Sequence, residues 1–309
     1  MKHFLSMKDF SEHEILRLIK LAEELAENPR KTGNQPLFAA NLFFEPSTRT
    51  KMSFTIAQRK LGIEVLDFFS EFSSTKKGES VYDTARTFEA LGASLLVVRH
   101  PQERLVDQLA QKLSIPIINA GDGKGEHPTQ CLLDLLTIHQ EFQSFRGLKV
   151  VIAGDIVHSR VARSNAYALN MLGAEVYLAS MPEWMDESLP YPYISIDEAV
   201  EFCDVVMLLR IQHERHESKM TATSNDYLTQ FGLTKERESR MKPGAVILHP
   251  APINRGVEID SDLVESSKSR IFKQMENGVS ARMAVMASLL EDRRIFHADA
   301  FNKREAISR

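Results

Sequence analysis

The stretch Ser47-Thr48-Arg49-Thr50 places three hydroxyls and a guanidinium just before an amphipathic helical pattern. The first N–H groups of a helix have no partner within the helix, and the helix dipole favours negative charge there. Hydroxyls add donors, and a guanidinium forms paired hydrogen bonds with phosphate oxygens. The same residues also suit ordinary capping by Ser47 or Thr48, with Arg49 in solvent. The stretch alone therefore predicts either a capped helix or a site for a small anion.

Three more arginines follow apolar runs that are typical of buried strands. Arg99 and Arg210 end two such runs, and Arg160 follows a third across a short loop. Ligands of open parallel sheets bind beyond the carboxyl ends of the strands, where these arginines are expected to lie. The formal net charge of the chain is −4, so this grouping of cations is not a by-product of a basic composition. It predicts binding of two small anions, a phosphate in one half and a dicarboxylate in the other.

Three loops carry further candidate residues. They are His127 and Gln130 in NAGDGKGEHPTQ (119–130), Ser73 and Lys77 in FSSTKKGES (72–80), and two prolines in HPAPINRGVEI (249–259). An imidazole and an amide at a helix start could hold a carbonyl oxygen and an amine, although a lone histidine is more often structural. The second loop could bring a hydroxyl and an ammonium to an anion, or be a solvated loop. The prolines could fix a tight turn whose carbonyls face a ligand.

Composition limits the class of protein. The 309 residues are 43% hydrophobic and 26% charged, which is typical of a folded globular chain of about two domains. The net charge argues against a broad nucleic-acid surface. No run approaches the ~20 apolar residues of a membrane helix, and no signal peptide is expected, so we expect a cytoplasmic protein. Cys131 and Cys203 are expected to be buried free thiols.

Short apolar strands alternate with amphipathic helices, which favours mainly parallel sheets. Helices are expected at 11–27, with a Ser11–Glu14 capping box, and at 48–61, 79–91, 104–113, 129–142, 160–172 and 278–290. Strands are expected at 37–44, 63–69, 95–99, 115–119, 148–153, 175–179, 205–209 and 245–248. The predicted fold is α/β with two domains, each a mainly parallel sheet flanked by helices. The first domain is expected at 1–136, with a returning C-terminal helix at about 285–309, and the second at 137–284.

Seven motifs occur in one order between residues 43 and 259. They are FFEPSTRTKMSF, KKGES, RHP, GDGKGEHPTQCLLDLLTI, GDIVHSRVARSN, LLRIQHERH and HPAPINRGVEI. With them the chain resembles the aspartate/ornithine carbamoyltransferase family, in its aspartate branch and in the catalytic-chain type of Gram-positive bacteria. S-T-R-T and H-P-T-Q mark the wider family, whereas KKGES and R-x-Q-x-E-R select the aspartate branch. An ornithine enzyme is expected to carry His-Cys-Leu-Pro where this chain has HPAP at 249–252.

The resemblance implies transfer of the carbamoyl group of carbamoyl phosphate to L-aspartate, for pyrimidine synthesis and without a metal or organic cofactor. It implies that the phosphate is bound by Ser47, Thr48, Arg49 and Thr50, and the carbonyl oxygen by Arg99, His127 and Thr50. The amino group is assigned to Gln130 and the carbonyls of Ala251 and Pro252. Aspartate is assigned to Lys77, Arg160, Arg210 and Gln212. Arg49, Thr50, Arg99 and His127 are the expected catalytic residues. Ser73 and Lys77 are expected from the neighbouring subunit of a homotrimer with shared sites. Val157 stands where many relatives carry lysine, which puts any contribution of that lysine in doubt.

Three rival functions remain at this stage. A carbamoyltransferase for ornithine is the nearest, against which the basic residues assigned to aspartate argue. A nucleotide-dependent oxidoreductase is another, although GDIVHSR at 154–160 is not G-x-G-x-x-G. The third is a non-catalytic scaffolding member, which the retained Arg49, His127 and Arg210 disfavour. No nucleic-acid or membrane partner is expected, and the motifs do not bear on regulatory chains or a dihydroorotase.

Overall fold

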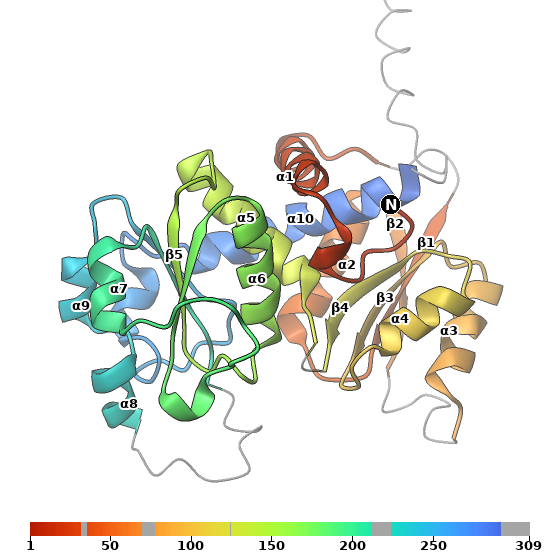
Figure 1. Cartoon of the computed structure of the whole chain (residues 1–309). Coiled ribbons are helices and arrows are strands. Elements are labelled where there is room, and N and C mark those ends of the chain that lie inside the picture. The colour runs from red at the N-terminus through yellow and green to blue at the C-terminus, as the bar shows by residue number, and fades with distance from the viewer. Residues whose placement is uncertain (32–35, 70–77, 124, 212–223, 292–309) are drawn as a thin grey trace, which may run out of the picture. The chain divides into compact units, whose positions relative to one another are not determined.

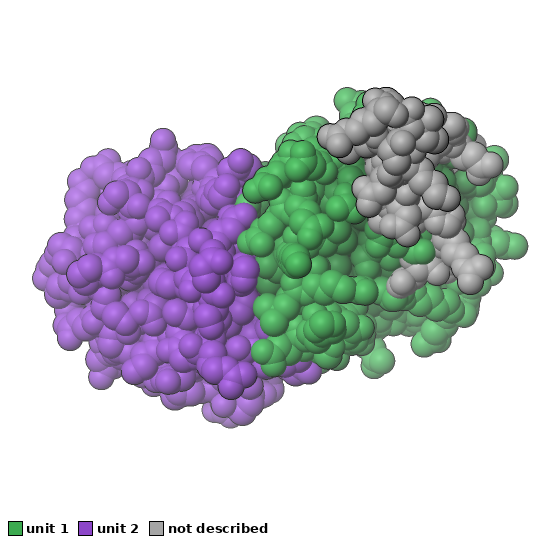
Figure 2. All heavy atoms as spheres, turned by 90° about the horizontal axis from the view of Figure 1, so that it is seen from above, with its two compact units in different colours: residues 1–129, 277–309 green, residues 130–276 purple. Residues whose placement is uncertain are grey.

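The computed structural model describes residues 1–31, 36–69, 78–123, 125–211 and 224–291. The chain divides into two compact units, which Figure 2 colours separately. Unit 1 comprises residues 1–129 and 277–309, and unit 2 comprises residues 130–276. Helices α5 (Pro128–Phe142) and α10 (Ile271–Glu291) each contain a unit boundary, so part of each helix belongs to unit 1 and part to unit 2.

Unit 1 contains a four-stranded parallel sheet with the strand order β2-β1-β3-β4 (Figure 1). Its strands are β1 (Leu37–Phe43), β2 (Ile63–Asp67), β3 (Leu95–His100) and β4 (Ile117–Asp122). Its remaining helices are η1 (Met7–Asp9), α1 (Glu12–Glu27), α2 (Thr48–Lys60), α3 (Val81–Ala90) and α4 (Leu105–Lys112). The order changes direction between β1 and β3, which makes this pair the switch point of the sheet.

Unit 2 repeats the arrangement with a four-stranded parallel sheet in the order β6-β5-β7-β8. Its strands are β5 (Lys149–Ala153), β6 (Glu175–Ala179), β7 (Val205–Leu208) and β8 (Val246–Leu248). Its helices include η4 (Pro182–Trp184), α6 (Arg160–Met171), α7 (Ile196–Phe202), α8 (Ser224–Phe231), α9 (Lys235–Arg240) and η6 (Ser261–Glu265). Here the switch point lies between β5 and β7.

Each sheet has apolar residues on both faces, as expected for parallel strands covered by helices. In unit 1, alternate residues of the two central strands share a core with α3 and α4: Ala40, Leu42, Leu96 and Val98. In unit 2, the corresponding residues share a core with α7: Val151, Ala153, Val206 and Leu208. The two sheets, which share one strand order, therefore also share the placement of their core residues.

The predicted α/β class with two mainly parallel sheets is confirmed, as are the Ser11–Glu14 capping box and the two buried free cysteines. The predicted start of the last helix at Gly278 is wrong, because α10 begins at Ile271. Gln274, in the first turn of α10 and outside the predicted range, is held by two buried hydrogen bonds. The strand predicted at 115–119 instead spans 117–122, and α7, α8 and α9 were not predicted. Among the described helices, none has the length and apolarity to cross a membrane.

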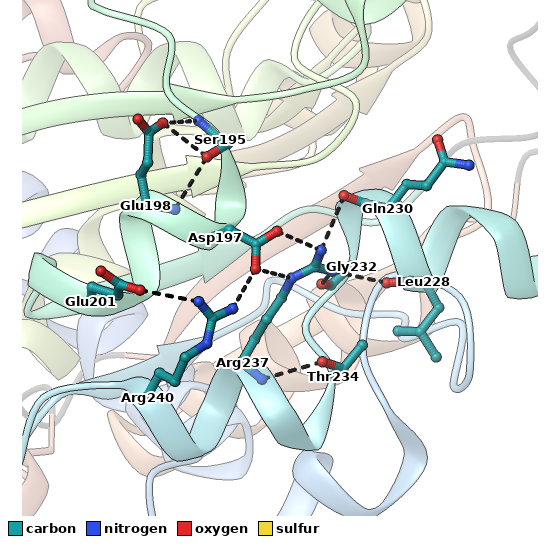
Figure 3. A network of polar contacts seen from close by, with 10 residues as sticks. All are labelled: Ser195, Asp197, Glu198, Glu201, Leu228, Gln230, Gly232, Thr234, Arg237 and Arg240. Atoms are coloured by element: carbon teal, nitrogen blue, oxygen red, sulfur yellow. Dashed lines mark hydrogen bonds and ion pairs between the residues drawn. The ribbon is translucent and has the colours of Figure 1, made fainter.

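Helices α7, α8 and α9 are joined by the side chain of Arg237, which is only 7% exposed (Figure 3). Its guanidinium donates to both carboxylate oxygens of Asp197 on α7, at 3.1 and 2.8 Å. It also donates to the carbonyls of Leu228, Gln230 and Gly232 at the end of α8. The hydrogen bonds from Arg237 lower the pKa of Asp197 to about 2, against the opposing effect of burial. Arg237 therefore links the three short helices through polar bonds.

Candidate functional site

The amino end of α2 differs from the other helix starts that carry a hydroxyl. Ser47 is the N-cap residue but makes no side-chain cap hydrogen bond, and the first turn contains no acidic residue. In contrast, the N-cap hydroxyls of α1, α3, α6, α7 and α9 each accept a backbone N–H from their own first turn. Capping by the Ser47 hydroxyl, one alternative raised by the sequence, is not formed. This helix end therefore suits an external anion.

A buried pair of amides holds α2 against β1. Asn41 of β1 and Gln58 of α2 are both fully buried and exchange two hydrogen bonds, at 2.9 and 2.8 Å. Each amide donates one of these hydrogen bonds and accepts the other, so both its nitrogen and its oxygen have a partner. It fixes the helix that carries Thr48 and Arg49, which are exposed, and Thr50, which is buried.

Arg99 lies at the carboxyl end of β3, in register with Phe43 at the end of β1. Its guanidinium forms an ion pair with Glu45 at 2.7 Å and donates to the carbonyl of Ala120 at 3.2 Å. Glu45 is two residues before Ser47, so the ion pair ties Arg99 to the segment that leads into α2. The structure thus brings the two predicted anion-binding segments of unit 1 to one switch point.

His127 ends a tightly bonded loop that follows β4. The carboxylate of Asp122 accepts the backbone N–H of Glu126 at 2.8 Å and that of Arg104 at 3.2 Å. Burial raises the pKa of Asp122. Gly123 has a φ of +40°, and a Cβ there would come within 2.6 Å of a backbone oxygen, so glycine is required. His127, which is 6% exposed, therefore follows β4, the strand that neighbours β3 and its residue Arg99.

Arg160 and Arg210 follow the two central strands of unit 2. Arg160 is the first residue of α6 and is 7% exposed, and the Ser159 hydroxyl caps the helix by accepting the N–H of Ala162. Arg210 follows β7 and is partly exposed. The N–H of Leu209 donates to the carbonyl of Ala153 at 2.7 Å, so the chain before Arg210 still lies beside β5. The backbone of both arginines therefore lies near the switch point of unit 2, between β5 and β7.

Arg163, one turn beyond Arg160, has a structural role. It donates to the carbonyl of Val157 at 3.0 Å and forms an ion pair with Asp186 at 2.7 Å. Burial raises the pKa of Asp186, but hydrogen bonds from Ser188 and Arg163 outweigh it and hold that pKa below its usual value. Val157 contributes this carbonyl and packs against an apolar cluster with Trp184.

The turn after β8 is held by a histidine with a defined tautomer. His249, which is 1% exposed, accepts the N–H of Ala251 at Nδ1, at 2.8 Å. Its Nε2 therefore carries the proton and donates to Glu258 at 3.0 Å. The Ala251–Pro252 peptide bond is cis, and Ala251 has a φ of 53°. Sequence reasoning predicted a tight turn here but missed the histidine that orients it.

Gln130, on α5, is 8% exposed and donates from Nε2 to Asp134 at 2.9 Å. Asp134 was not predicted as a site residue, although its position four residues after Gln130 places both on one helix face. Ser73, Lys77 and Gln212 lie outside the described residues. Within the described ranges, no group of three or more His, Cys, Asp or Glu side chains is arranged to hold a metal ion.

Known proteins resemble the whole chain. Residues 2–140 match the family model for the aspartate/ornithine carbamoyltransferase carbamoyl-P binding domain, and residues 146–289 match that for the Asp/Orn binding domain. The aspartate carbamoyltransferase catalytic subunit of Oceanobacillus iheyensis is 58% identical over 100% of this chain and 99% of its own.

Solved structures agree with these sequence matches. The aspartate transcarbamoylase of Trypanosoma cruzi in complex with carbamoyl phosphate and aspartate has a TM-score of 0.84 and 30% identity, over 92% of this chain and 95% of that one. The catalytic subunit of M. jannaschii aspartate transcarbamoylase has a TM-score of 0.83 and 34% identity, over 95% and 99%.

Proposed function

The chain belongs to the aspartate/ornithine carbamoyltransferase family, and from this membership we propose that it is an aspartate carbamoyltransferase. It transfers the carbamoyl group of carbamoyl phosphate to the amine of L-aspartate, giving N-carbamoyl-L-aspartate and phosphate. The reaction belongs to pyrimidine biosynthesis and takes place in the cytoplasm. Beyond the 58% identity to a curated catalytic subunit, the observation that carries the proposal is the start of α2. There the Ser47 hydroxyl makes no cap hydrogen bond, and the Arg99–Glu45 pair lies in the segment that leads into the helix.

The phosphate of carbamoyl phosphate binds at the amino end of α2. Ser47, Thr48 and Thr50 contribute hydroxyls and backbone N–H groups, and Arg49 adds a charged donor. A bound phosphate supplies the acceptor that the Ser47 side chain does not provide. The Asn41–Gln58 amide pair keeps the helix in place whether or not the phosphate is bound.

Carbon–nitrogen bond formation places negative charge on the carbonyl oxygen. The unprotonated amine of aspartate attacks the carbonyl carbon, and Arg99, Thr50 and His127 donate to the oxygen as charge develops. Losing one such donor typically costs about 3–4 kcal/mol in transition-state stabilisation. The departing phosphate accepts the proton released from the amine, so the reaction needs no side-chain base. Holding the two substrates in contact supplies further acceleration.

Aspartate is bound by cations because it carries two carboxylates. Arg160 and Arg210, from the switch point of unit 2, bind them together with Lys77 and Gln212. A guanidinium can bind a carboxylate with two parallel hydrogen bonds, which fixes the orientation of the substrate. Ornithine offers an amine where aspartate has its second carboxylate, so the same residues would repel it.

The active enzyme is a homotrimer in which Ser73 and Lys77 reach the site of a neighbouring subunit. Mixing Lys77→Ala chains with Arg49→Ala chains, each inactive alone, should restore part of the activity, because some sites then receive both intact halves. No recovery after confirmed subunit exchange would contradict shared sites.

Steady-state kinetics with carbamoyl phosphate and either aspartate or ornithine test the activity itself. We expect turnover with aspartate and at least a thousandfold lower kcat/KM with ornithine, because a site that binds a carboxylate discriminates strongly against its absence. The assay should follow phosphate release and carbamoyl-aspartate formation together on protein of known mass in solution. Turnover with neither amine would overturn the proposed function.

A further inference from the structure

A buried carboxylate on α5 gathers three amide side chains of unit 2. Asp134 is 0% exposed, and its Oδ1 accepts from Gln130 Nε2 at 2.9 Å and from Gln274 Nε2 at 2.8 Å. Its Oδ2 accepts from Asn165 Nδ2 at 2.9 Å. Hydrogen bonds to a charged acceptor are about twice as strong as those between neutral groups. The three bonds hold side chains from α5, α6 and α10 to a single centre.

This carboxylate determines which way each amide points. Both oxygens of Asp134 act as acceptors in these bonds, so each of the three amides presents its NH₂ group to them. The oxygen of each amide is thereby turned away from Asp134. For Gln130, the side chain assigned to the amino group of the carbamoyl donor, the consequence is that Oε1 is the atom left to meet that group.

A second arm runs from Asp134 to the turn after β8. The Oε1 of Gln274 accepts the backbone N–H of His249 at 2.9 Å. The imidazole of His249 in turn accepts the N–H of Ala251 and donates to Glu258. The position of the 249–252 turn therefore depends on the orientation of one amide bound to Asp134.

The same arm continues toward Arg210. Glu258 Oε1 also accepts the N–H of Asn254 at 2.6 Å, and Asn254 Nδ2 donates to the carbonyl of Ile211 at 3.2 Å. Ile211 follows Arg210, the residue assigned to aspartate. The chain of bonds from Asp134 thus reaches both substrate positions, but its shortest branches end at Gln130 and the 249–252 turn.

We propose that Asp134 is the positioning residue that makes the subsite for the amino group of the carbamoyl donor consist of acceptors alone. This inference rests on the proposed function, which assigns Gln130 and the carbonyls of Ala251 and Pro252 to that amino group. Three oriented oxygens satisfy the N–H groups of –NH₂ but leave a methyl group facing unpaired acceptors. Asp134 therefore determines the preference for a carbamoyl over an acetyl group without contacting either.

Three ligands separate this role from general support of the fold. Carbamoyl phosphate carries the amino group, and acetyl phosphate has a methyl group in its place. N-(phosphonacetyl)-L-aspartic acid, the compound bound in one T. cruzi relative, lacks that amino group, because the nitrogen on its acyl carbon is the one that belongs to aspartate. A subsite for the amino group affects only the first of the three.

Asp134→Asn is the first variant. Its NH₂ group must face at least one of the three amides, and each amide that it faces has to turn over or lose its bond. Turning Gln130 presents a donor to the substrate amine, and turning Gln274 removes the acceptor of the His249 N–H. We expect KM for carbamoyl phosphate to rise about 10–100-fold, since an unpaired buried polar group costs about 1–3 kcal/mol. The inhibition constant of acetyl phosphate and the Kd of N-(phosphonacetyl)-L-aspartic acid should change less than about threefold.

Gln274→Met tests the second arm alone, because it keeps side-chain length but removes both hydrogen bonds. We expect about a tenfold rise in KM for carbamoyl phosphate, with the other two ligands again unaffected. Thr137→Val is the matched control on the same helix, because it removes the hydroxyl that donates to the carbonyl of Leu133, one turn back. It should leave all three ligands unchanged.

The outcomes separate the two proposals. Inactivity of the wild-type chain with carbamoyl phosphate and aspartate would overturn the proposed function and with it the basis of this inference. With an active wild type, equal weakening of all three ligands in Asp134→Asn and Gln274→Met would assign Asp134 to general support and overturn the inference. Unchanged carbamoyl phosphate kinetics in both variants would also overturn it.

Discussion

The two sheets share one strand order, but the helices that follow their first strands begin in different ways. In unit 2, the hydroxyl of Ser159 caps α6, and Arg163 in the first turn is paired with Asp186. In unit 1, the hydroxyl of Ser47 makes no cap bond to α2. The same topology therefore gives one helix end satisfied by the protein and another suited to a ligand. Function depends on how the helix ends are completed and not on the sheet itself.

The cations at the two switch points differ accordingly. In unit 1, Arg99 is engaged by Glu45 at the carboxyl edge, so it is held in position before substrate arrives. A helix end with several N–H donors suits a phosphate, which has many acceptor oxygens. In unit 2, Arg160 starts a helix that is already capped, so the proposal rests there on the guanidinium of Arg160 and not on the helix end. Guanidiniums suit the two separate carboxylates of aspartate.

The largest effect should come from removing the charged donor at the helix end of unit 1. We expect Arg49→Ala to lower kcat/KM at least a hundred- to a thousandfold, as for loss of a donor to transition-state charge. Circular dichroism and thermal unfolding should remain close to wild type because Arg49 is exposed. Arg59→Ala, an exposed arginine in the last turn of α2, is the matched control and should retain activity. Near-normal turnover of Arg49→Ala would remove the assignment of α2 to phosphate.

Removing a cation from unit 2 should affect the other substrate. We expect Arg210→Ala to raise KM for aspartate about 10–100-fold, the loss of a hydrogen bond to a charged group being worth about 1.5–3 kcal/mol. KM for carbamoyl phosphate should change less than about threefold. Initial rates over a grid of both substrates measure the two constants together.

Arg163→Ala is the contrasting variant in unit 2. It leaves Asp186 without its ion-pair partner, so it should lower the free energy of unfolding while KM for aspartate stays near wild type. If Arg163→Ala weakened aspartate binding as much as Arg210→Ala, the division between binding and structural arginines would be wrong.

The two N-cap serines allow the most direct test of the comparison. Ser159→Ala should lower the free energy of unfolding by about 1 kcal/mol, the usual cost of a lost cap, with KM for carbamoyl phosphate unchanged. Ser47→Ala should change stability by less than about 0.5 kcal/mol, because no cap bond is lost. It should instead raise KM for carbamoyl phosphate about three- to tenfold. Urea unfolding gives the free energy of unfolding of each variant, and substrate kinetics give its KM for carbamoyl phosphate. A loss of stability in Ser47→Ala but not in Ser159→Ala would contradict the proposed difference between the two helix ends.

Local sequence patterns predicted most of the fold but only part of the site. Apolar strands of five to seven residues and capping boxes are local features, so β1, β5 and α1 were located within a residue or two. The short helices α7 to α9 were missed, α7 despite its own Ser195–Glu198 capping box, because helices of six to eight residues show little periodicity. Arg237 joins them through contacts distant in sequence. Likewise, motif residues such as Arg99 were named, whereas Gln274 has no local feature that places it beside Asp134. Hydrogen bonds between distant side chains appear only in three dimensions.

The smallest effect should appear away from both switch points, at helix α7. The pKa of Asp197 is held at about 2 by Arg237, below the ordinary value of 3.8, with a further bond from Arg240. A lowered folded-state pKa stabilises the protein above the unfolded value, and this contribution is lost as the pH falls from about 4 to about 2. The free energy of unfolding of Asp197→Asn should therefore lie below that of wild type at pH 6. The difference should shrink through pH 4 and 3. Because half of this carboxylate is exposed, solvent screening keeps the effect small. Activity at pH 7 should be unchanged, since Asp197 pairs with α9 and not with a substrate-binding residue. If the difference in the free energy of unfolding between the two proteins did not narrow in acid, Asp197 would act through something other than its charge.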